Sequence, residues 1–280
     1  MKPKQIVIDK DAFTGINFDR LCNFAKNHLL ILPDILCYEC HTDFRIKPRR
    51  TLTHCKQLIQ YGAYYCSCST GFLRCEGSSL EPYPWFLPDL EVMCRIKNGT
   101  SGNGVANAMQ MFKARSDVAC RLFVDTIDRI CKRASSELQD SLKKIQSQGI
   151  KDRFAKFLNH IGANKDQMRD FALRSMPAGW VKNLNRFCLS DKWISWHYFR
   201  LVRVIAMEYS CRGLSGGAPT KKHAEHDYQD MEYVLLLSRA DSLLTRDKKL
   251  VKPLAKAAFP EKDVFSSLDE VPDEYLCNWS

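Results

Sequence analysis

The stretch HDYQDMEYVLLLSRADSLLTRD, residues 226–247, decides the fold that we expect for this chain. Its first part, up to Ala240, has the apolar spacing of a helix, and SLLT at 242–245 is a short apolar run typical of a buried strand. Asp247 follows closely, at the expected C-terminal edge of that strand. A helix that leads into a buried strand is typical of α/β proteins.

The beginning of the chain shows the same alternation. QIVID at residues 5–9 indicates a buried strand that ends in Asp9, and LLILP at 29–33 indicates a second one. We expect a helix over about 17–28, and another through ILCYECHTDF, which contains Glu39. Strand and helix alternating at this spacing predict an α/β fold with a central parallel sheet.

The C-terminal part resumes this pattern after a mainly helical middle. RDKKLVKPLAKAAF predicts a turn and a helix, and DVFSSL predicts a last strand. Residues 61–103 are rich in Cys, Tyr, Pro and Gly, so we expect them to be irregular or short-stranded. Helices are expected at 104–147, 150–162, 166–175 and 193–211.

These differences in pattern predict two parts in the chain. Residues 1–60 together with 213–280 form the expected α/β core, and GLSGGAPTKK at 213–222 is an expected loop. Residues 61–212 form a Cys-rich, helical insertion or subdomain. The length of 280 residues is ample for such a core and its elaboration.

Composition favours a polyanionic partner. Lys and Arg number 42 against 32 Asp and Glu, which gives a net charge of +10. A surplus of this size favours nucleic acid, although many basic proteins bind no polyanion. No secretory signal opens the sequence and no apolar run reaches the roughly 18 residues of a membrane span, so we expect a cytoplasmic protein without membrane contact.

The 13 cysteines have two interpretations. In the cytoplasm, reduced and mostly buried thiols are expected. A structural zinc site is the alternative, and it usually shows two pairs of cysteines with two to four residues between them. Cys66 and Cys68 are too close for that spacing, and Cys37 and Cys40 have it but lie on an expected helix without a second pair. The candidate ligands would be His54, Cys55, Cys66, Cys68 and Cys75.

The acidic residues near strand ends suggest a cation site. Asp9 and Asp247 follow strands whose carboxyl ends meet at one edge of a parallel sheet, where ligands bind. Glu39 lies on the helix after the second strand, and Asp227 and Asp230 share a helix face. Clustered carboxylates repel one another unless a cation lies among them, and oxygen ligands suit Mg²⁺ or Mn²⁺. The alternative is that these acids are solvated surface charges or helix caps.

This ordered set of motifs resembles the PIN-domain ribonucleases. The match consists of IVID with Asp9, LLILPDILCYE with Glu39, and DMEYVLLLSRADSLLTRD with Asp230, Thr245 and Asp247. The resemblance implies a PIN-like three-layer sandwich. It also implies that the four matched acids bind metal and that the Thr245 hydroxyl supports the site. Asp227 matches a further polar position found in part of the family and is ranked just behind them.

The resemblance implies a metal-dependent phosphodiesterase that cuts RNA and leaves a 5′-phosphate and a 3′-hydroxyl. It covers about residues 1–50 and 220–270. Many small PIN proteins resemble toxins paired with an antitoxin, so an inhibitor-like protein partner is one expectation. The large insertion departs from that compact pattern and suggests a region for recognising a substrate or a partner.

Basic residues lie near the same expected edge of the sheet. If the metal site is real, they become candidate phosphate contacts; otherwise they form a solvated face. The candidates are Arg49, Arg50, Arg246, Lys248 and Lys249.

The leading hypothesis is a metal-dependent endoribonuclease. Two alternatives stay open: a DNA-directed or toxin-like defence nuclease on the same site, and a catalytically silent PIN-like scaffold that binds RNA or protein. The four matched acids favour an enzyme over the silent scaffold.

Overall fold

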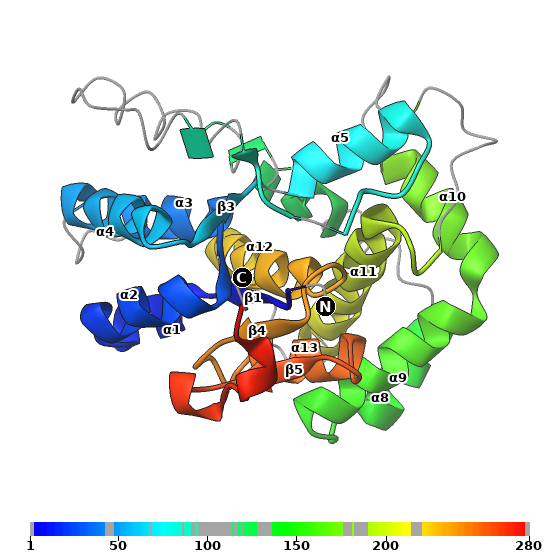
Figure 1. Cartoon of the computed structure of the whole chain (residues 1–280). Coiled ribbons are helices and arrows are strands. Elements are labelled where there is room, and N and C mark those ends of the chain that lie inside the picture. Colours follow the sequence, from blue (N-terminus) through cyan, green and yellow to red (C-terminus); the bar gives the residue numbers. More distant parts are fainter. Residues whose placement is uncertain are drawn as a thin grey trace.

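The computed structural model (Figure 1) shows a mixed α/β protein that is mostly helical and contains one parallel sheet. The residues that it describes are 3–42, 48–67, 69–85, 87–90, 93–94, 114, 117–118, 120–121, 123–127, 136–175, 181, 190–213 and 220–277.

The sheet has five strands in the order β3-β2-β1-β4-β5, and all neighbouring strands are parallel. This confirms the predicted α/β class and the parallel sheet. The strands are β1 (Gln5–Ile8), β2 (Leu29–Pro33), β3 (Tyr64–Cys66), β4 (Ser242–Leu244) and β5 (Asp263–Phe265).

The strand order creates a switch point between β1 and β4. The chain runs outward from β1 through β2 to β3, and then returns to place β4 on the other side of β1, with Val7 opposite Leu243. Every residue of β1, β2 and β4 is buried, which explains why these strands are uninterrupted apolar runs. In open parallel sheets, ligands bind at the carboxyl ends of the strands beside such a switch point.

Four helices accompany the first strands. They are α1 (Lys10–Gly15), α2 (Phe18–Asn27), α3 (Asp34–Thr42) and α4 (Pro48–Gln60). The Asn17 side chain begins α2 by accepting hydrogen bonds from the backbone N–H groups of Asp19 and Arg20. α4 packs against both α2 and α3.

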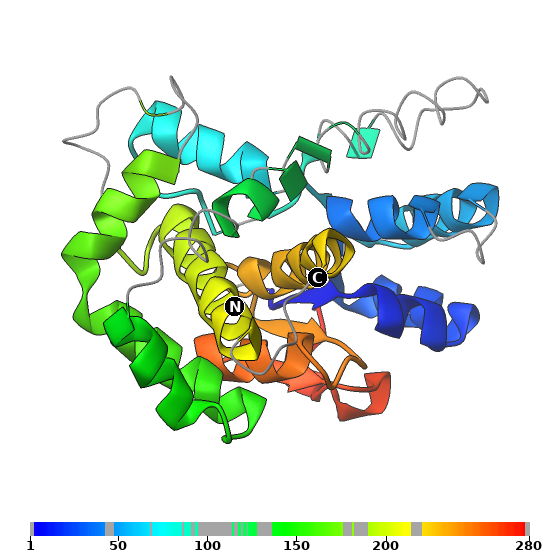
Figure 2. The ribbon, with the colours of Figure 1, turned by 180° about the vertical axis from the view of Figure 1, so that it is seen from behind.

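The remaining helices surround the C-terminal strands. α12 packs against β1 and α3, α13 packs against β5, and α11 packs against α12, α9 and α5. Figure 1 and Figure 2 both show α8, α9 and α10 along the side of the molecule away from α1–α4. Their bounds are α5 (Ser69–Ser79), α8 (Ser136–Ile145), α9 (Ile150–Ala163), α10 (Lys165–Ser175), α11 (Ile194–Gly213), α12 (Lys221–Leu236) and α13 (Val251–Ala258), with short 3₁₀ turns at Leu268–Glu270 and Asp273–Tyr275.

The expectation of an irregular or short-stranded segment at 61–103 was wrong in part, because this segment contains the helix α5. Phe72 and Leu73 bury one side of α5 in the core. The buried Glu232 carboxylate on α12 accepts a hydrogen bond from the backbone N–H of Ser69, at the start of α5, over 3.0 Å. These tertiary contacts stabilise a helix whose Gly and Ser content gives little intrinsic preference.

The expected insertion contributes to the sheet and to the core. β3 lies beyond residue 60 and pairs with β2, so the sheet continues into the 61–212 segment. Phe123, Phe154 and Phe157 belong to the same hydrophobic cluster as β1. Of the helix expected over 104–147, α8 and short pieces lie within the described residues, and the rest lies outside them.

A buried carboxylate joins α5 to the start of α11. Glu76 has no exposed surface, and it accepts hydrogen bonds from the backbone N–H groups of Tyr83, Ile194 and Ser195, each over 2.8 Å. It also accepts a hydrogen bond from the Ser195 hydroxyl, and Arg239 lies 3.7 Å away. We call Glu76 and these donors the Glu76 hub.

Within the part of the chain that the structure describes, none of the helices combines the length and apolarity needed to cross a bilayer.

Candidate active site

Asp9 lies at the switch point, directly after β1, and it begins α1 as its N-cap. One carboxylate oxygen accepts a hydrogen bond from the backbone N–H of Ala12 over 2.7 Å, and the other accepts one from the Thr245 hydroxyl. The Thr245 oxygen in turn accepts a hydrogen bond from the backbone N–H of Asp247 over 3.1 Å. The buried Thr245 therefore connects the ends of β1 and β4 and fixes the orientation of Asp9.

Asp247 holds the turn between β4 and α13. Its Oδ1 atom accepts three backbone hydrogen bonds, from Lys249, Leu250 and Val251, over 3.0, 2.7 and 2.8 Å. The helix-cap interpretation of the acids therefore applies to Asp9, whereas Asp247 holds the turn that precedes α13, whose N-cap is Leu250. These bonds leave the Oδ2 atom of Asp247 without a hydrogen bond from any described residue.

Glu39 projects from α3 and connects this helix to α12. Its side chain is 6% exposed, and its Oε2 atom accepts a hydrogen bond from the hydroxyl of Tyr233. Burial, with a smaller contribution from the nearby Asp9 and Asp11 carboxylates, raises the pKa of Glu39 to about 7. Burial raises the pKa of Asp9 to about 7 as well, against the opposing effect of the Thr245 hydrogen bond.

Asp230 on α12 is the least compensated carboxylate of the group. No described residue donates a hydrogen bond to it or forms a salt bridge with it. Burial raises its pKa well above the usual value, and nearby carboxylates raise it further. These carboxylates are Glu39, Asp247, Asp227 and Asp9. The structure thus brings Asp230 within electrostatic reach of every other predicted acid.

Asp227 differs from Asp230, although both lie on α12. Its Oδ2 atom accepts a hydrogen bond from the Tyr209 hydroxyl on α11 over 2.6 Å. Burial raises its pKa, and this hydrogen bond opposes the shift. Asp227 is therefore held by the neighbouring helix α11.

The donor set fits a hard divalent cation in chemistry. Asp9, Glu39, Asp230 and Asp247 offer only carboxylate oxygens, as Mg²⁺ and Mn²⁺ prefer. A cation would offset the mutual repulsion that raises the pKa of Asp230. As the side chains stand, no three His, Cys, Asp or Glu residues among those described are close enough together to hold an ion.

The predicted phosphate contacts are only partly described. Arg246, Lys248 and Lys249 are exposed beside Asp247, and Arg246 donates a hydrogen bond to the Gly15 carbonyl over 3.0 Å. Arg49 and Arg50 fall in the first turn of α4, and their side chains lie outside the described residues.

Three residues near the carboxylates were missed by the sequence reasoning. Tyr233 holds Glu39, and its spacing of three from Asp230 on a helix was the available signal. Asp11 raises the pKa of Asp9 and Glu39, and Lys10 lowers that of Glu39. Their signal was their position immediately after the first strand.

The cysteines show no zinc centre within the described part of the chain. Six described cysteines are buried, while Cys75 and Cys94 are exposed. Cys37 and Cys55 lie 3.9 Å apart between α3 and α4. Cys68, one of the predicted zinc ligands, lies outside the described residues.

Comparisons of the chain with protein-family models, with curated proteins and with solved structures each gave no match. The resemblance to PIN-domain ribonucleases stays one of ordered motifs, carried by Asp9, Glu39, Asp230, Thr245 and Asp247.

Proposed function

We propose that this protein is a metal-dependent endoribonuclease that hydrolyses phosphodiester bonds at the carboxyl end of β1 and β4. The observation that carries the proposal is the group formed by Asp9, Glu39, Asp230 and Asp247 beside the switch point. Two of these carboxylates have pKa values raised to about 7, and that of Asp230 is raised well above its usual value. Unfavourable burial of this kind is typical of functional sites.

In this proposal the four carboxylates hold one or two Mg²⁺ or Mn²⁺ ions. Such an ion, when bound, neutralises the acids, polarises a phosphoryl oxygen and promotes the ionisation of water. Thr245 keeps Asp9 oriented, and Tyr233 keeps Glu39 oriented, so both are positioning residues. Asp230 supplies the carboxylate that no described side chain compensates.

The basic character of the chain supports a nucleic-acid substrate. The net charge is +10, and exposed Arg246, Lys248 and Lys249 flank the acidic edge, where they can contact phosphates on either side of the scissile bond. The basic residues attract the polyanion, and a cation held by the carboxylates would offset their repulsion of the phosphate. RNA is the leading substrate, and DNA is the alternative that the experiment distinguishes.

The test is cleavage of labelled RNA and DNA, each single- and double-stranded, with Mn²⁺, Mg²⁺ or EDTA. Asp9→Asn is compared with Asp241→Asn, because Asp241 is an aspartate at the opposite end of the sheet, where it accepts a hydrogen bond from the backbone N–H of Gln5 over 2.8 Å. We expect metal-dependent cleavage of RNA that Asp9→Asn lowers by about 100-fold or more, the size of effect found when one charge-stabilising group leaves an active site. Asp241→Asn should keep most of the activity.

Four results would contradict the proposal. Cleavage that survives in Asp9→Asn, and cleavage that continues in EDTA, would each place the activity elsewhere. A preference for DNA supports the nuclease chemistry but overturns the ribonuclease assignment. Binding of RNA by both proteins, with cleavage by neither, supports the scaffold alternative.

A further inference from the structure

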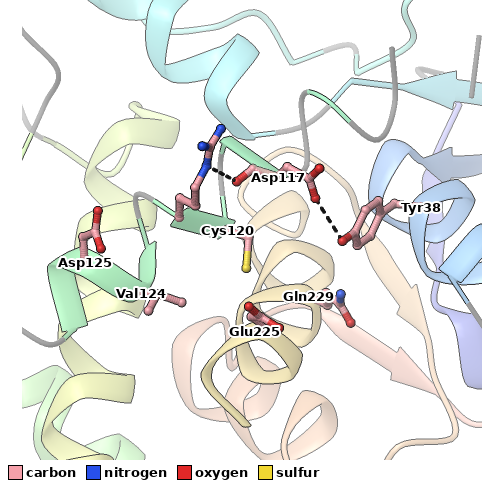
Figure 3. Close-up of a pocket in the computed structure, with 8 residues that line it drawn as sticks. Tyr38, Asp117, Cys120, Val124, Asp125, Glu225 and Gln229 are labelled. Carbon is pink, nitrogen blue, oxygen red and sulfur yellow. Dashed lines mark hydrogen bonds between the residues drawn. The ribbon is translucent and has the colours of Figure 1, made fainter. Parts of the chain in front are cut away.

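A pocket of about 460 Å³ lies next to the acidic edge, between α3, α12 and the described residues of the 117–125 segment. Figure 3 shows Glu225 and Gln229 facing it from α12, Tyr38 from α3, and Cys120 and Val124 from the opposite wall. This volume falls within the usual range for small-ligand sites.

The α12 wall offers polar groups with unused hydrogen-bonding capacity. Glu225 and Gln229 are half-buried and one helical turn apart, and no described residue hydrogen-bonds to either side chain. A carboxylate accepts hydrogen bonds only, whereas the amide of Gln229 both donates and accepts. The pair can therefore read a flat ligand that has two adjacent donors beside an acceptor.

On the other sides of the pocket, hydrogen bonds hold Tyr38 of α3 and Arg121 to Asp117. The Tyr38 hydroxyl donates a hydrogen bond to Asp117 over 3.2 Å, and Arg121 donates one from Nε to the Asp117 carbonyl over 3.2 Å. Burial, followed by the nearby Asp117 carboxylate, raises the pKa of Tyr38 to about 12, so its hydroxyl remains protonated. Tyr38 thus presents an aromatic ring of settled orientation to the pocket.

The described lining of the pocket disfavours a phosphate as its ligand. It contains the carboxylates of Asp117, Asp125 and Glu225 and the guanidinium of Arg121. An anion beside α12 would be repelled by the Glu225 carboxylate, to which no described residue donates a hydrogen bond. A neutral group whose hydrogen-bond donors face the carboxylates is favoured.

The pocket adjoins the proposed catalytic edge through two shared helices. Tyr38 is next to Glu39 on α3, and Gln229 is next to Asp230 on α12. Neighbouring residues on a helix point about 100° apart, so the pocket and the acidic edge face different directions. An RNA strand whose phosphate lies at the acidic edge must therefore turn one base out of its stack to place that base in the pocket. Unstacked bases of this kind occur in single strands and loops of RNA, where proteins read their Watson–Crick edges.

From this geometry we propose that the pocket binds one unstacked guanine base of the RNA that is cut at the acidic edge, an inference that rests on the proposed function. Guanine presents its N1–H and N2–H groups side by side, which matches the two oxygens of Glu225. Its O6 atom accepts a hydrogen bond from the Gln229 amide, and its ring lies against Tyr38. Uracil has no exocyclic amino group and offers one donor only.

The test measures binding in EDTA, so that it does not depend on cleavage. The probes are labelled eight-nucleotide oligouridines, either unmodified or with one central guanosine, adenosine or cytidine. We expect the guanosine probe to bind wild type about tenfold more tightly than the unmodified probe, the size of one good bidentate base contact. Glu225→Gln and, separately, Gln229→Ala should remove most of this preference, while Glu81→Gln, at an exposed glutamate away from the pocket, should keep it.

Equal affinity for all four probes, preference for another base, or a guanosine preference that survives in Glu225→Gln would each overturn the inference. Thermal unfolding of each variant ensures that only folded protein is compared. Guanosine preference without any metal-dependent cleavage would support guanine binding in the pocket and refute the proposed function. Metal-dependent cleavage without guanosine preference would support the proposed function and refute guanine binding in the pocket.

Discussion

Glu76 is fully buried and Asp230 is half-buried, and the protein surrounds these two carboxylates in opposite ways. Glu76 accepts four hydrogen bonds within its hub and has Arg239 at 3.7 Å. Asp230 receives none from any described residue, and the charged neighbours that raise its pKa are other carboxylates. The helices that carry them, α5 and α12, both pack against α11.

This difference in surroundings means that Glu76 stabilises the fold, whereas the charged form of Asp230 is unfavourable in it. Buried polar groups are normally hydrogen-bonded, and each exception needs an explanation. The Glu76 hub obeys the rule, because its hydrogen-bond donors come from Tyr83 and from the start of α11, and it joins both segments to α5. Asp230 is half-buried and lies among other carboxylates without a hydrogen bond from any described residue, as expected of a site that binds a positively charged ligand.

The largest expected effect is the loss of the Glu76 hub. Glu76→Ala leaves three backbone N–H groups without an acceptor and removes the carboxylate beside Arg239, whose side chain is 8% exposed. We expect the free energy of unfolding to fall by about 3–5 kcal/mol. Urea denaturation measures it, with Glu81→Ala as an exposed control. A loss below about 1 kcal/mol would show that the hub does not hold these segments together.

A second effect concerns His197, which follows the hub on α11. It is 4% exposed, its Nε2 atom bonds the Asp191 carbonyl over 2.9 Å, and burial, with a smaller effect of Arg200, lowers its pKa from 6.5 to about 4. Between these two values the unfolded chain takes up the proton and the folded chain does not. Stability from this group is therefore complete above about pH 6.5 and is lost as the pH falls toward 4.

The measurement is the free energy of unfolding of wild type and His197→Gln between pH 4 and pH 7. The difference between the two proteins should change by about 2–3 kcal/mol across this range, with wild type relatively less stable at the acid end. Taking the difference cancels the carboxylates of the acidic edge, whose raised pKa values act in the opposite direction. Parallel pH profiles for the two proteins would show that His197 does not titrate as its burial implies.

The smallest expected effect is that of Asp230→Asn, which should raise the free energy of unfolding, whereas Glu76→Ala should lower it. Asp230→Asn removes a charge that burial and nearby carboxylates disfavour in the folded state. In EDTA at pH 7.5 we expect stability to rise, on the order of 1 kcal/mol. With Mn²⁺ present, wild type should gain stability that Asp230→Asn does not gain, because only wild type keeps the full set of ligands.

Thermal unfolding with and without Mn²⁺ checks this prediction, and Asp241→Asn is again the matched control. If Asp230→Asn lowers stability under both conditions, Asp230 is a structural acid like Glu76. The comparison on which the proposed function rests would then fail.

The strands of the fold were readable where burial leaves a continuous apolar run. β1, β2 and β4 are buried on both faces, so their sequences contain no polar alternation to obscure them. β3 has three residues and α5 contains glycine and serine, so neither has a strong local pattern. Both depend on contacts with distant residues, such as the bond from Ser69 to Glu232, which no local window reveals.

The candidate site was likewise predictable where local sequence determines it and not where contacts between distant residues do. Asp9 and Asp247 could be placed at one edge because each follows a strand, and parallel strands end together. The bonds from Tyr233 to Glu39 and from Tyr209 to Asp227 require α12 to pack against α3 and α11, which sequence spacing does not specify. The pocket was missed for the same reason, because its walls meet only in three dimensions.

The pairing of β1 with β4 also sets the order in which the acidic edge can assemble during synthesis. The bond from Thr245 to Asp9 joins residues 236 positions apart, so the acidic edge cannot form until the ribosome has passed residue 245. At ordinary elongation rates, synthesis of the intervening segment takes roughly 10–50 s. Over that interval the emerging N-terminal segment carries Asp9 and Glu39 without their partners. A nuclease of the proposed kind would therefore stay inactive beside the RNA of the ribosome that makes it until both halves of its site have emerged.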